Sequence, residues 1–138
     1  MKQEESTFEE AFTYLYFLML SADKIADPSE LKLGAKVMQL ENLNKTAVMN
    51  KIDFLSTLPR EQVFDDGRNC LKALNKEDQL KCLGYLKLMS KTDGSVDVKE
   101  IELLNNLSAK ELNISLADIS KKEKDLEYAI SKLSAPGT

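Results

Sequence analysis

The sequence predicts an all-α protein, a compact bundle of seven helices that forms a single domain over residues 1–138. Apolar residues recur at three- and four-residue steps along most of the chain, which is the spacing of one helix face. No run of residues alternates cleanly between apolar and polar, so strands are not expected. A short acidic turn occurs twice between amphipathic helices, which predicts two pseudo-symmetric helix–acidic turn–helix units at about residues 6–58 and 75–133.

Five of the expected helices begin with a capping residue that is followed three positions later by an acid. The cap oxygen accepts a hydrogen bond from a backbone N–H of the first turn. The negative charge of the acid interacts favourably with the positive end of the helix dipole. The pairs are Ser6 with Glu9, Asp27 with Glu30, Asn75 with Asp78, Asp97 with Glu100, and Ser115 with Asp118.

The two remaining helices lie between Lys45 and Pro59 and over residues 63–74. Proline disfavours a helical conformation in the residue before it, so Pro59 should stop the first of these helices. Residues 65–67, with the sequence Asp-Asp-Gly, fall in the middle of the second helix and leave its continuity open.

The apolar positions also define the expected core. Leu31 and Leu116 fall on the inner faces of their helices, whereas the charged run of residues 121–124 is expected to be a solvated face. The first helix should reach about Ala22, and the second should end near residues 42–44. Packing in the core explains the aromatic residues of the first helix, which are Phe12, Tyr14, Tyr16 and Phe17.

Composition excludes several classes of function. The chain has 138 residues, of which 43% are apolar, enough for one core, and its net charge of −4 argues against nucleic acid as a partner. It contains no histidine, so a Ser-His-Asp triad, a Cys-His pair and a zinc site built on imidazole are impossible. We therefore expect a protein that is not an enzyme.

The expected location is cytoplasmic. Residues 1–6 are acidic where a signal peptide would be basic, so export is not expected. The apolar stretch Ala11 to Leu20 is shorter than the ~20 residues that a membrane-spanning helix needs, so we expect no insertion into a membrane. Cys70 and Cys82 lack metal-site spacing and are expected to be reduced core thiols.

The acidic turn is the feature that points to a function. Its two copies run from Asp23 to Glu30 and from Asp93 to Glu100, at a constant offset of 70 residues, and Leu18-Met19 falls on Leu88-Met89 in the preceding helices. All three acids of each turn align. The candidate metal ligands are Asp23, Asp27, Glu30, Asp93, Asp97 and Glu100.

These acids fit a divalent cation, Ca²⁺ or another, since Ca²⁺ takes six to eight oxygen ligands. One turn offers three carboxylates, so strong binding requires the fold to bring both turns together. A true EF-hand is not expected, because Met89 and Lys91 stand where the first ligands of such a loop belong. The same acids also have a structural explanation as helix caps and turn formers, each cap being worth about 1 kcal/mol without any metal.

The second turn, Thr92 to Glu100, resembles the Ala-Asp-Gly-x-Ile/Val-x-x-x-Glu turn of the TerB-like tellurite-resistance family and lacks only the alanine. The following residues 112–115, Leu-Asn-Ile-Ser, are similar to the family's Leu-Gly-Ile-Ser. The first turn departs more, with Lys24 at the glycine position and Ala26 at the branched one. The resemblance covers about residues 17–119. It implies a seven-helix bundle, an acidic cluster that holds a divalent cation, and a role in bacterial stress response or beside a membrane complex.

We therefore expect a non-enzymatic binding module that presents an acidic surface to a protein partner, as a monomer or a homodimer. Two other hypotheses stay open. One is a carboxylate-based metal hydrolase whose two acidic turns share a pair of ions, and the other is a purely structural protein that oligomerises.

Overall fold

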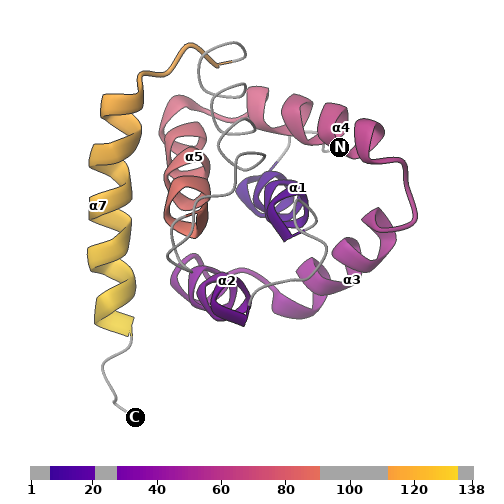
Figure 1. Ribbon diagram of the computed structural model, residues 1–138, viewed down its shortest axis with the longest axis horizontal. Coiled ribbons are helices and arrows are strands. Elements are labelled where there is room, and N and C mark those ends of the chain that lie inside the picture. The colour runs from indigo at the N-terminus through magenta and orange to yellow at the C-terminus, as the bar shows by residue number, and fades with distance from the viewer. Residues whose placement is uncertain (1–6, 21–27, 91–111, 134–138) are drawn as a thin grey trace.

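The computed structural model describes residues 7–20, 28–90 and 112–133, which form six α-helices and no β-strand (Figure 1). The all-helical class predicted from the sequence is confirmed. The expected helix that begins at Asp97 lies in residues 91–111, outside the described residues. The helices are α1 (Phe8–Leu20), α2 (Pro28–Leu40), α3 (Lys45–Leu55), α4 (Arg60–Lys72), α5 (Lys76–Ser90) and α7 (Leu116–Leu133).

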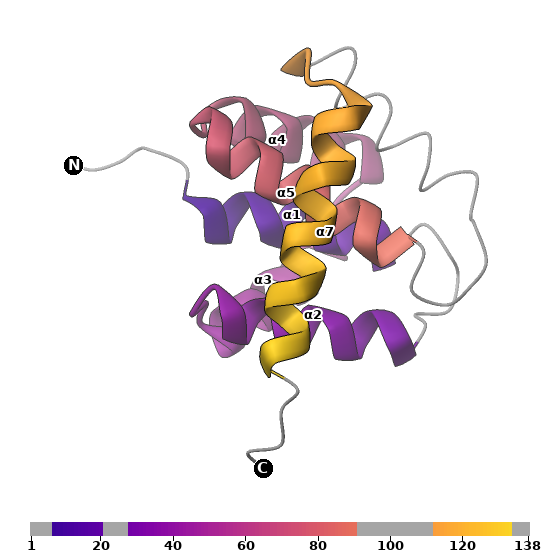
Figure 2. The ribbon, with the colours of Figure 1, turned by 90° about the vertical axis from the view of Figure 1, so that its left-hand side faces the viewer.

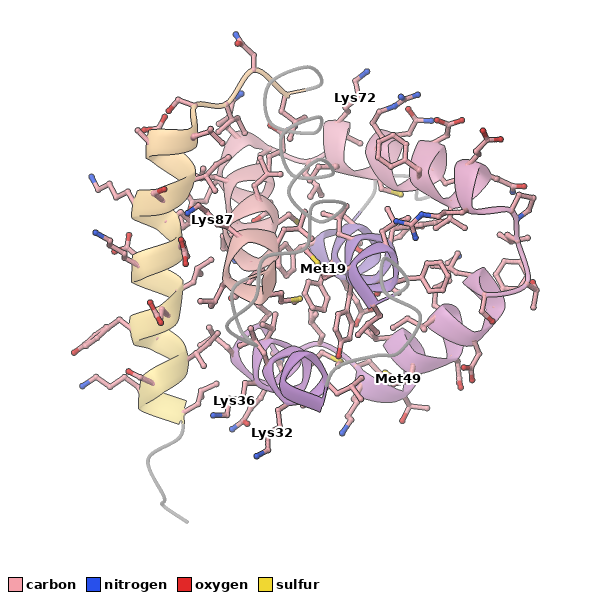
Figure 3. All side chains as sticks on the ribbon, in the orientation of Figure 1. Met19, Lys32, Lys36, Met49, Lys72 and Lys87 are labelled. Carbon is pink, nitrogen blue, oxygen red and sulfur yellow. The ribbon has the colours of Figure 1, made fainter. Side chains whose placement is uncertain are left out.

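Helix α1 is the centre of the molecule, and the other helices surround it (Figure 1). It packs against α3, α4 and α5, while α7 forms an outer layer on α5 and α2. Eight of the 13 residues of α1 are buried, including Met19, which Figure 3 shows among the surrounding helices. The predicted core positions of the aromatic residues are confirmed for Phe12, Tyr14 and Tyr16, which are at most 7% exposed, and Phe17 is partly buried against them.

Two of the predicted helix starts are formed as expected. The Asn75 side-chain oxygen accepts the backbone N–H of Asp78 at 2.8 Å, which starts α5. The Ser115 hydroxyl accepts the N–H of Asp118 at 3.1 Å, which starts α7. Helix α2 also begins at the predicted Pro28.

The first helix starts one residue later than the predicted pair of Ser6 and Glu9. Its cap hydrogen bond runs from the Glu10 N–H to the Thr7 hydroxyl, at 3.0 Å. Thr7 and Glu10 have the same spacing as the predicted pair, so the sequence offers two overlapping registers. Glu9 is used elsewhere, since its carboxylate accepts the N–H of Asn44 at 2.8 Å and joins the start of α1 to the start of α3.

Helix α2 ends at Leu40, slightly before the predicted 42–44, in a Schellman motif. Asn42 adopts the left-handed conformation, with φ of 57°, which asparagine tolerates better than most residues. The Leu43 N–H then bonds to the Met38 carbonyl at 2.8 Å, and the Asn42 N–H bonds to the Gln39 carbonyl at 3.2 Å. This turn fixes the position of Glu41, the residue between α2 and Asn42.

Helix α4 is continuous through Asp65, Asp66 and Gly67, which settles the question that the sequence left open. Gly67 lies where α4 crosses α1, and a Cβ at this position would be 2.9 Å from the Cβ of Tyr14. The glycine therefore permits close packing of the two helices and does not break α4.

Two core predictions are wrong. Leu31 and Leu116 were expected on inner faces, but they are 42% and 53% exposed. Each lies in the first turn of its helix. Val37, which was not among the expected inner positions, is fully buried instead.

Candidate functional site

The acidic turns fall largely outside the part of the chain that the structure describes. Glu30 lies in the first turn of α2. The other five predicted ligands lie outside the described residues, so the structure does not test whether the six carboxylates meet. These five are Asp23, Asp27, Asp93, Asp97 and Glu100.

The helix ends that flank the turns are described, and they share one side of the molecule. Figure 2 shows the C-terminal ends of α1 and α5 and the N-terminal end of α2 on its right-hand side. Helices α1 and α5 also pack directly against each other. The described helix ends that lead into the two acidic turns therefore lie on the same side of the core.

A positive charge lies at the end of α1. The guanidinium of Arg60, in the first turn of α4, donates a hydrogen bond to the Leu18 carbonyl at 3.3 Å. Carbonyls of the last helical turn have no partner within the helix, and they carry the negative end of the helix dipole. Arg60 therefore stabilises the C-terminal end of α1, five residues before Asp23.

Glu41, the residue that follows α2, is the acceptor in a cluster of polar side chains. Its carboxylate accepts the Tyr85 hydroxyl at 2.5 Å and the Lys81 ammonium at 2.8 Å, both from α5. The same ammonium lies 4.8 Å from the centre of the Phe8 ring, at the distance of a cation–π interaction. Burial and the hydrogen bond to Glu41 raise the pKa of Tyr85. The hydroxyl therefore stays protonated, and the cluster joins the end of α2 to α5.

The carboxylate of Glu123 in α7 is buried, and it corrects a prediction. Residues 121–124 were expected to be a solvated face, but Glu123 is only 3% exposed. Its carboxylate lies 3.3 Å from the ammonium of Lys87, which reaches from α5 toward α7 (Figure 3). The spacing could have revealed this, because Glu123 falls on the same helix stripe as Ile119, Leu126 and Ile130.

Tyr85 and Lys81 carry no comparable sequence signal. Helix α5 packs against α1 and α2 as well as against α7, so residues around most of its circumference are buried. A single apolar stripe at helical spacing predicts one buried face and cannot indicate burial on several sides.

The two cysteines agree with the sequence prediction of reduced thiols. Neither forms a disulfide, and Cys82 is buried while Cys70 is partly buried. Burial raises the pKa of Cys82, so its thiol is protonated and unreactive at neutral pH.

The described surface offers shallow depressions. One of about 280 Å³ lies between the first turns of α1 and α3, with Glu9, Glu10 and Lys51 on its walls. Within the described residues, no group of three or more cysteine or acidic side chains is arranged to hold a metal ion. None of the helices formed by these residues has both the length and the apolar character needed to cross a bilayer.

Comparison with known proteins gives no relative, since no family model, curated protein or solved structure matches the chain. The likeness to the TerB-like family therefore rests on the turn motif in the sequence.

Proposed function

We propose that this chain is a non-enzymatic, TerB-like binding module. Its two acidic turns together hold one divalent cation and present an acidic surface to a protein partner. The observation that carries this proposal is the shared side of the molecule from which α1 and α5 lead into the two turns (Figure 2). A single turn supplies three carboxylates, and pooling doubles that number.

Electrostatics favours a cation where the turns converge. Six carboxylates in one place repel each other, and a bound divalent ion relieves that repulsion. The described part of this region adds Arg60, whose guanidinium lies at the end of α1. This positive charge offsets part of the negative charge of the first turn, so the second turn should contribute more to cation affinity.

The turns can be tested separately by calorimetric titration of Ca²⁺, Mg²⁺, Mn²⁺ and Zn²⁺ into the purified full chain. Asp23→Asn/Glu30→Gln removes two acids from the first turn, and Asp93→Asn/Glu100→Gln removes two from the second. Each double variant should lose at least about tenfold in affinity if the site is pooled, because each ligand pair is then needed. The second-turn variant should lose more.

A matched control carries the same change of charge away from the turns. Asp53→Asn/Asp125→Asn alters exposed acids on α3 and α7, and it should keep the wild-type affinity. Wild-type protein that binds none of the four ions up to millimolar concentration would contradict the cation proposal. Loss of affinity in the second-turn variant alone would contradict pooling and leave one weak single-turn site.

The protein partner would bind the acidic side through basic residues, in keeping with the bacterial stress role that the family resemblance implies. Such binding weakens as salt is added, because counter-charges screen the contact. A cation in the turns would reduce the negative charge that the partner meets. Partner binding measured with and without the ion therefore tests whether the two parts of the proposal are linked.

A further inference from the structure

The corner between α2 and α3 carries charge of the opposite sign to the acidic turns. Residues 31–50 hold three lysines, at positions 32, 36 and 45, and a single acid, Glu41, in a chain whose net charge is −4. The Glu41 carboxylate points inward, since it accepts hydrogen bonds from two side chains of α5 and its side chain is only 13% exposed. Lys32 and Lys45 are exposed. The surface charge of this stretch is therefore positive.

Lysines elsewhere in the described residues have acids close to them. Helix α5 carries Lys81 and Lys87, but each of these pairs with a glutamate. On α7 the exposed lysines alternate with exposed acids such as Asp118 and Asp125. The corner differs because acids of its own stretch do not neutralise its exposed lysines.

A depression of about 400 Å³ lies at the same corner, and its size is within the range of ligand sites. Its lining, which we call the corner site, consists of Ala35, Met38, Gln39, Asn42, Leu43 and Lys45. The apolar part is recessed, because Met38 is 3% exposed and Leu43 is partly buried. The described residues of this lining include no acid, whereas the depressions at the starts of α1 and α4 each have two acids on their walls.

The backbone of the corner site is held in place by its own hydrogen bonds. Asn42 is left-handed, and the bonds from the N–H groups of Asn42 and Leu43 to the last turn of α2 fix the reversal of the chain. The Asn44 side chain then accepts the N–H of Ala47 at 3.0 Å and starts α3. A site that is already ordered loses less conformational freedom when it binds, so more of the contact energy contributes to affinity.

The side chains of the site match a peptide better than a lipid surface. Gln39 and Asn42 are exposed, and each amide offers both a donor and an acceptor, which pair with the C=O and N–H of a peptide backbone. Lys32 lies seven residues before Gln39 on the same face of α2, and Figure 3 shows it pointing away from the core together with Lys36. A helix that binds a bilayer inserts projecting apolar side chains, whereas the apolar side chains of this site are recessed.

We propose that the corner site binds an acidic peptide segment of a partner protein. One apolar side chain of the segment sits in the depression against Met38 and Leu43, and neighbouring carboxylates face Lys32 and Lys45. The exposed amides of the site pair with the backbone of the segment. The site prefers the opposite charge to the acidic turns, so the protein has two separate binding surfaces, and the corner site does not depend on a cation.

Titration of a synthetic peptide, acetyl-Glu-Asp-Leu-Glu-Asp-amide, into the isotopically labelled full chain tests the proposal by NMR. The side-chain amide signals of Gln39 and Asn42 and the backbone signals of residues 35–45 should shift and saturate. The affinity should fall as salt is added, because salt screens the charges. Replacement of the peptide's leucine by glycine should weaken binding at least about tenfold, since the apolar contact is lost.

Two double variants locate the charge that the peptide meets. Lys32→Gln/Lys45→Gln removes both exposed lysines of the corner, and the affinity should fall at least about tenfold. Lys121→Gln/Lys124→Gln removes the same charge from the exposed face of α7 and is the matched control, with affinity near that of wild type. All four lysines are exposed, so both variants should fold as the wild type does.

Signal shifts that are absent up to millimolar peptide, or that spread over the whole surface, would overturn the proposal. Equal affinities for the leucine and glycine peptides would overturn the seat for an apolar side chain. Equal losses in the two lysine variants would overturn the location of the site.

Vesicles of phosphatidylserine and phosphatidylcholine are the second probe. If they perturb the signals of the corner and the peptide does not, the surface is a membrane contact and the peptide proposal is wrong. Asp93→Asn/Glu100→Gln should bind the peptide as the wild type does, which separates this test from that of the acidic turns. A loss of affinity in that variant would overturn the independence of the two surfaces.

Discussion

The joints that attach α2 and α7 to the centre of the molecule use the same two kinds of residue, with different results. The α2 joint consists of Gly34 and Glu41, and the α7 joint consists of Gly84 and Glu123 with its Lys87. In each joint a glycine allows two helices to approach, and a carboxylate meets a lysine. The stiffness of each joint depends on the side chains that the glycine and the carboxylate contact.

At Gly34, α2 rests on the ring of Tyr16, which is 1% exposed. A Cβ at Gly34 would overlap the hydroxyl and ring carbons of that tyrosine. The ring is rigid and enclosed, so it has no room to yield. At Gly84 the nearest atom is a leucine methyl, which can rotate away. The α2 joint is therefore interlocked and the α7 joint is adjustable.

The carboxylates differ in the same direction. Glu41 accepts hydrogen bonds from Tyr85 at 2.5 Å and from Lys81 at 2.8 Å, and a charged acceptor makes such bonds strong. Glu123 lies 3.3 Å from Lys87, which is a longer contact. The glycine and the glutamate of each joint thus lie at a close contact between helices. The residues that face them determine how rigid that contact is.

The largest difference between the joints should come from adding one methyl group to each glycine. Gly34→Ala should lower the free energy of unfolding by about 3 kcal/mol, because the methyl overlaps the enclosed Tyr16 ring. Gly84→Ala should change it by less than about 1 kcal/mol, since the gain in helix propensity offsets a contact that Leu126 can relieve. Urea unfolding of both variants measures this. Equal losses would show that the two crossings are equally rigid.

Removal of a single hydroxyl tests the carboxylate of the α2 joint. Tyr85→Phe takes away the hydrogen bond to Glu41 and should cost about 2 kcal/mol, the range for a bond to a charged group. Tyr128→Phe is the matched control, because Tyr128 is 64% exposed. Urea unfolding should leave that control within about 0.5 kcal/mol of wild type. If Tyr85→Phe and the control unfold at the same urea concentration, the hydrogen bond to Glu41 does not make the α2 joint the stronger one.

The smallest effect concerns the exposed ion pair beside the α7 joint. The hydrogen bond from Lys122, followed by its charge, lowers the pKa of Glu77. A lowered pKa in the folded state means that the pair stabilises the protein above the ordinary glutamate pKa and that this is lost as the pH falls through the lowered value. Glu77→Gln should therefore cost a few tenths of a kcal/mol at pH 7 and nothing measurable near pH 2, as followed by urea unfolding. A cost that persists at the low pH would mean that the pair's charge is not its source.

Much of the fold follows from local patterns in the sequence. The starts of α5 and α7 could be predicted because Asn75 and Ser115 act within their own first turns. The sequence patterns did not predict features that depend on contacts between distant parts of the chain. Glu41 and Tyr85 are 44 residues apart, and no local spacing connects them. Glu123 was the intermediate case, since its place on an apolar stripe was visible but its charge argued for solvent.

The candidate site divides in the same way. Its six acids were found because the turn repeats at a fixed offset, which is a property of the sequence itself. Arg60 was not found, because its contact with the Leu18 carbonyl joins residues 42 positions apart. Charges that modify a site from another helix become visible only once the helices are packed.

The hydrogen bond from the Asn44 N–H to the Glu9 carboxylate makes the start of α3 depend on a residue 35 positions earlier. Asn44 caps its own helix through the Ala47 N–H, but its own amide is bonded to α1. A synthetic peptide of residues 43–57 would thus carry the sequence of α3 without the negative charge that sits at its amino end in the whole protein. Such a peptide should be less helical than its sequence suggests, and α3 should form late, after α1 is in place.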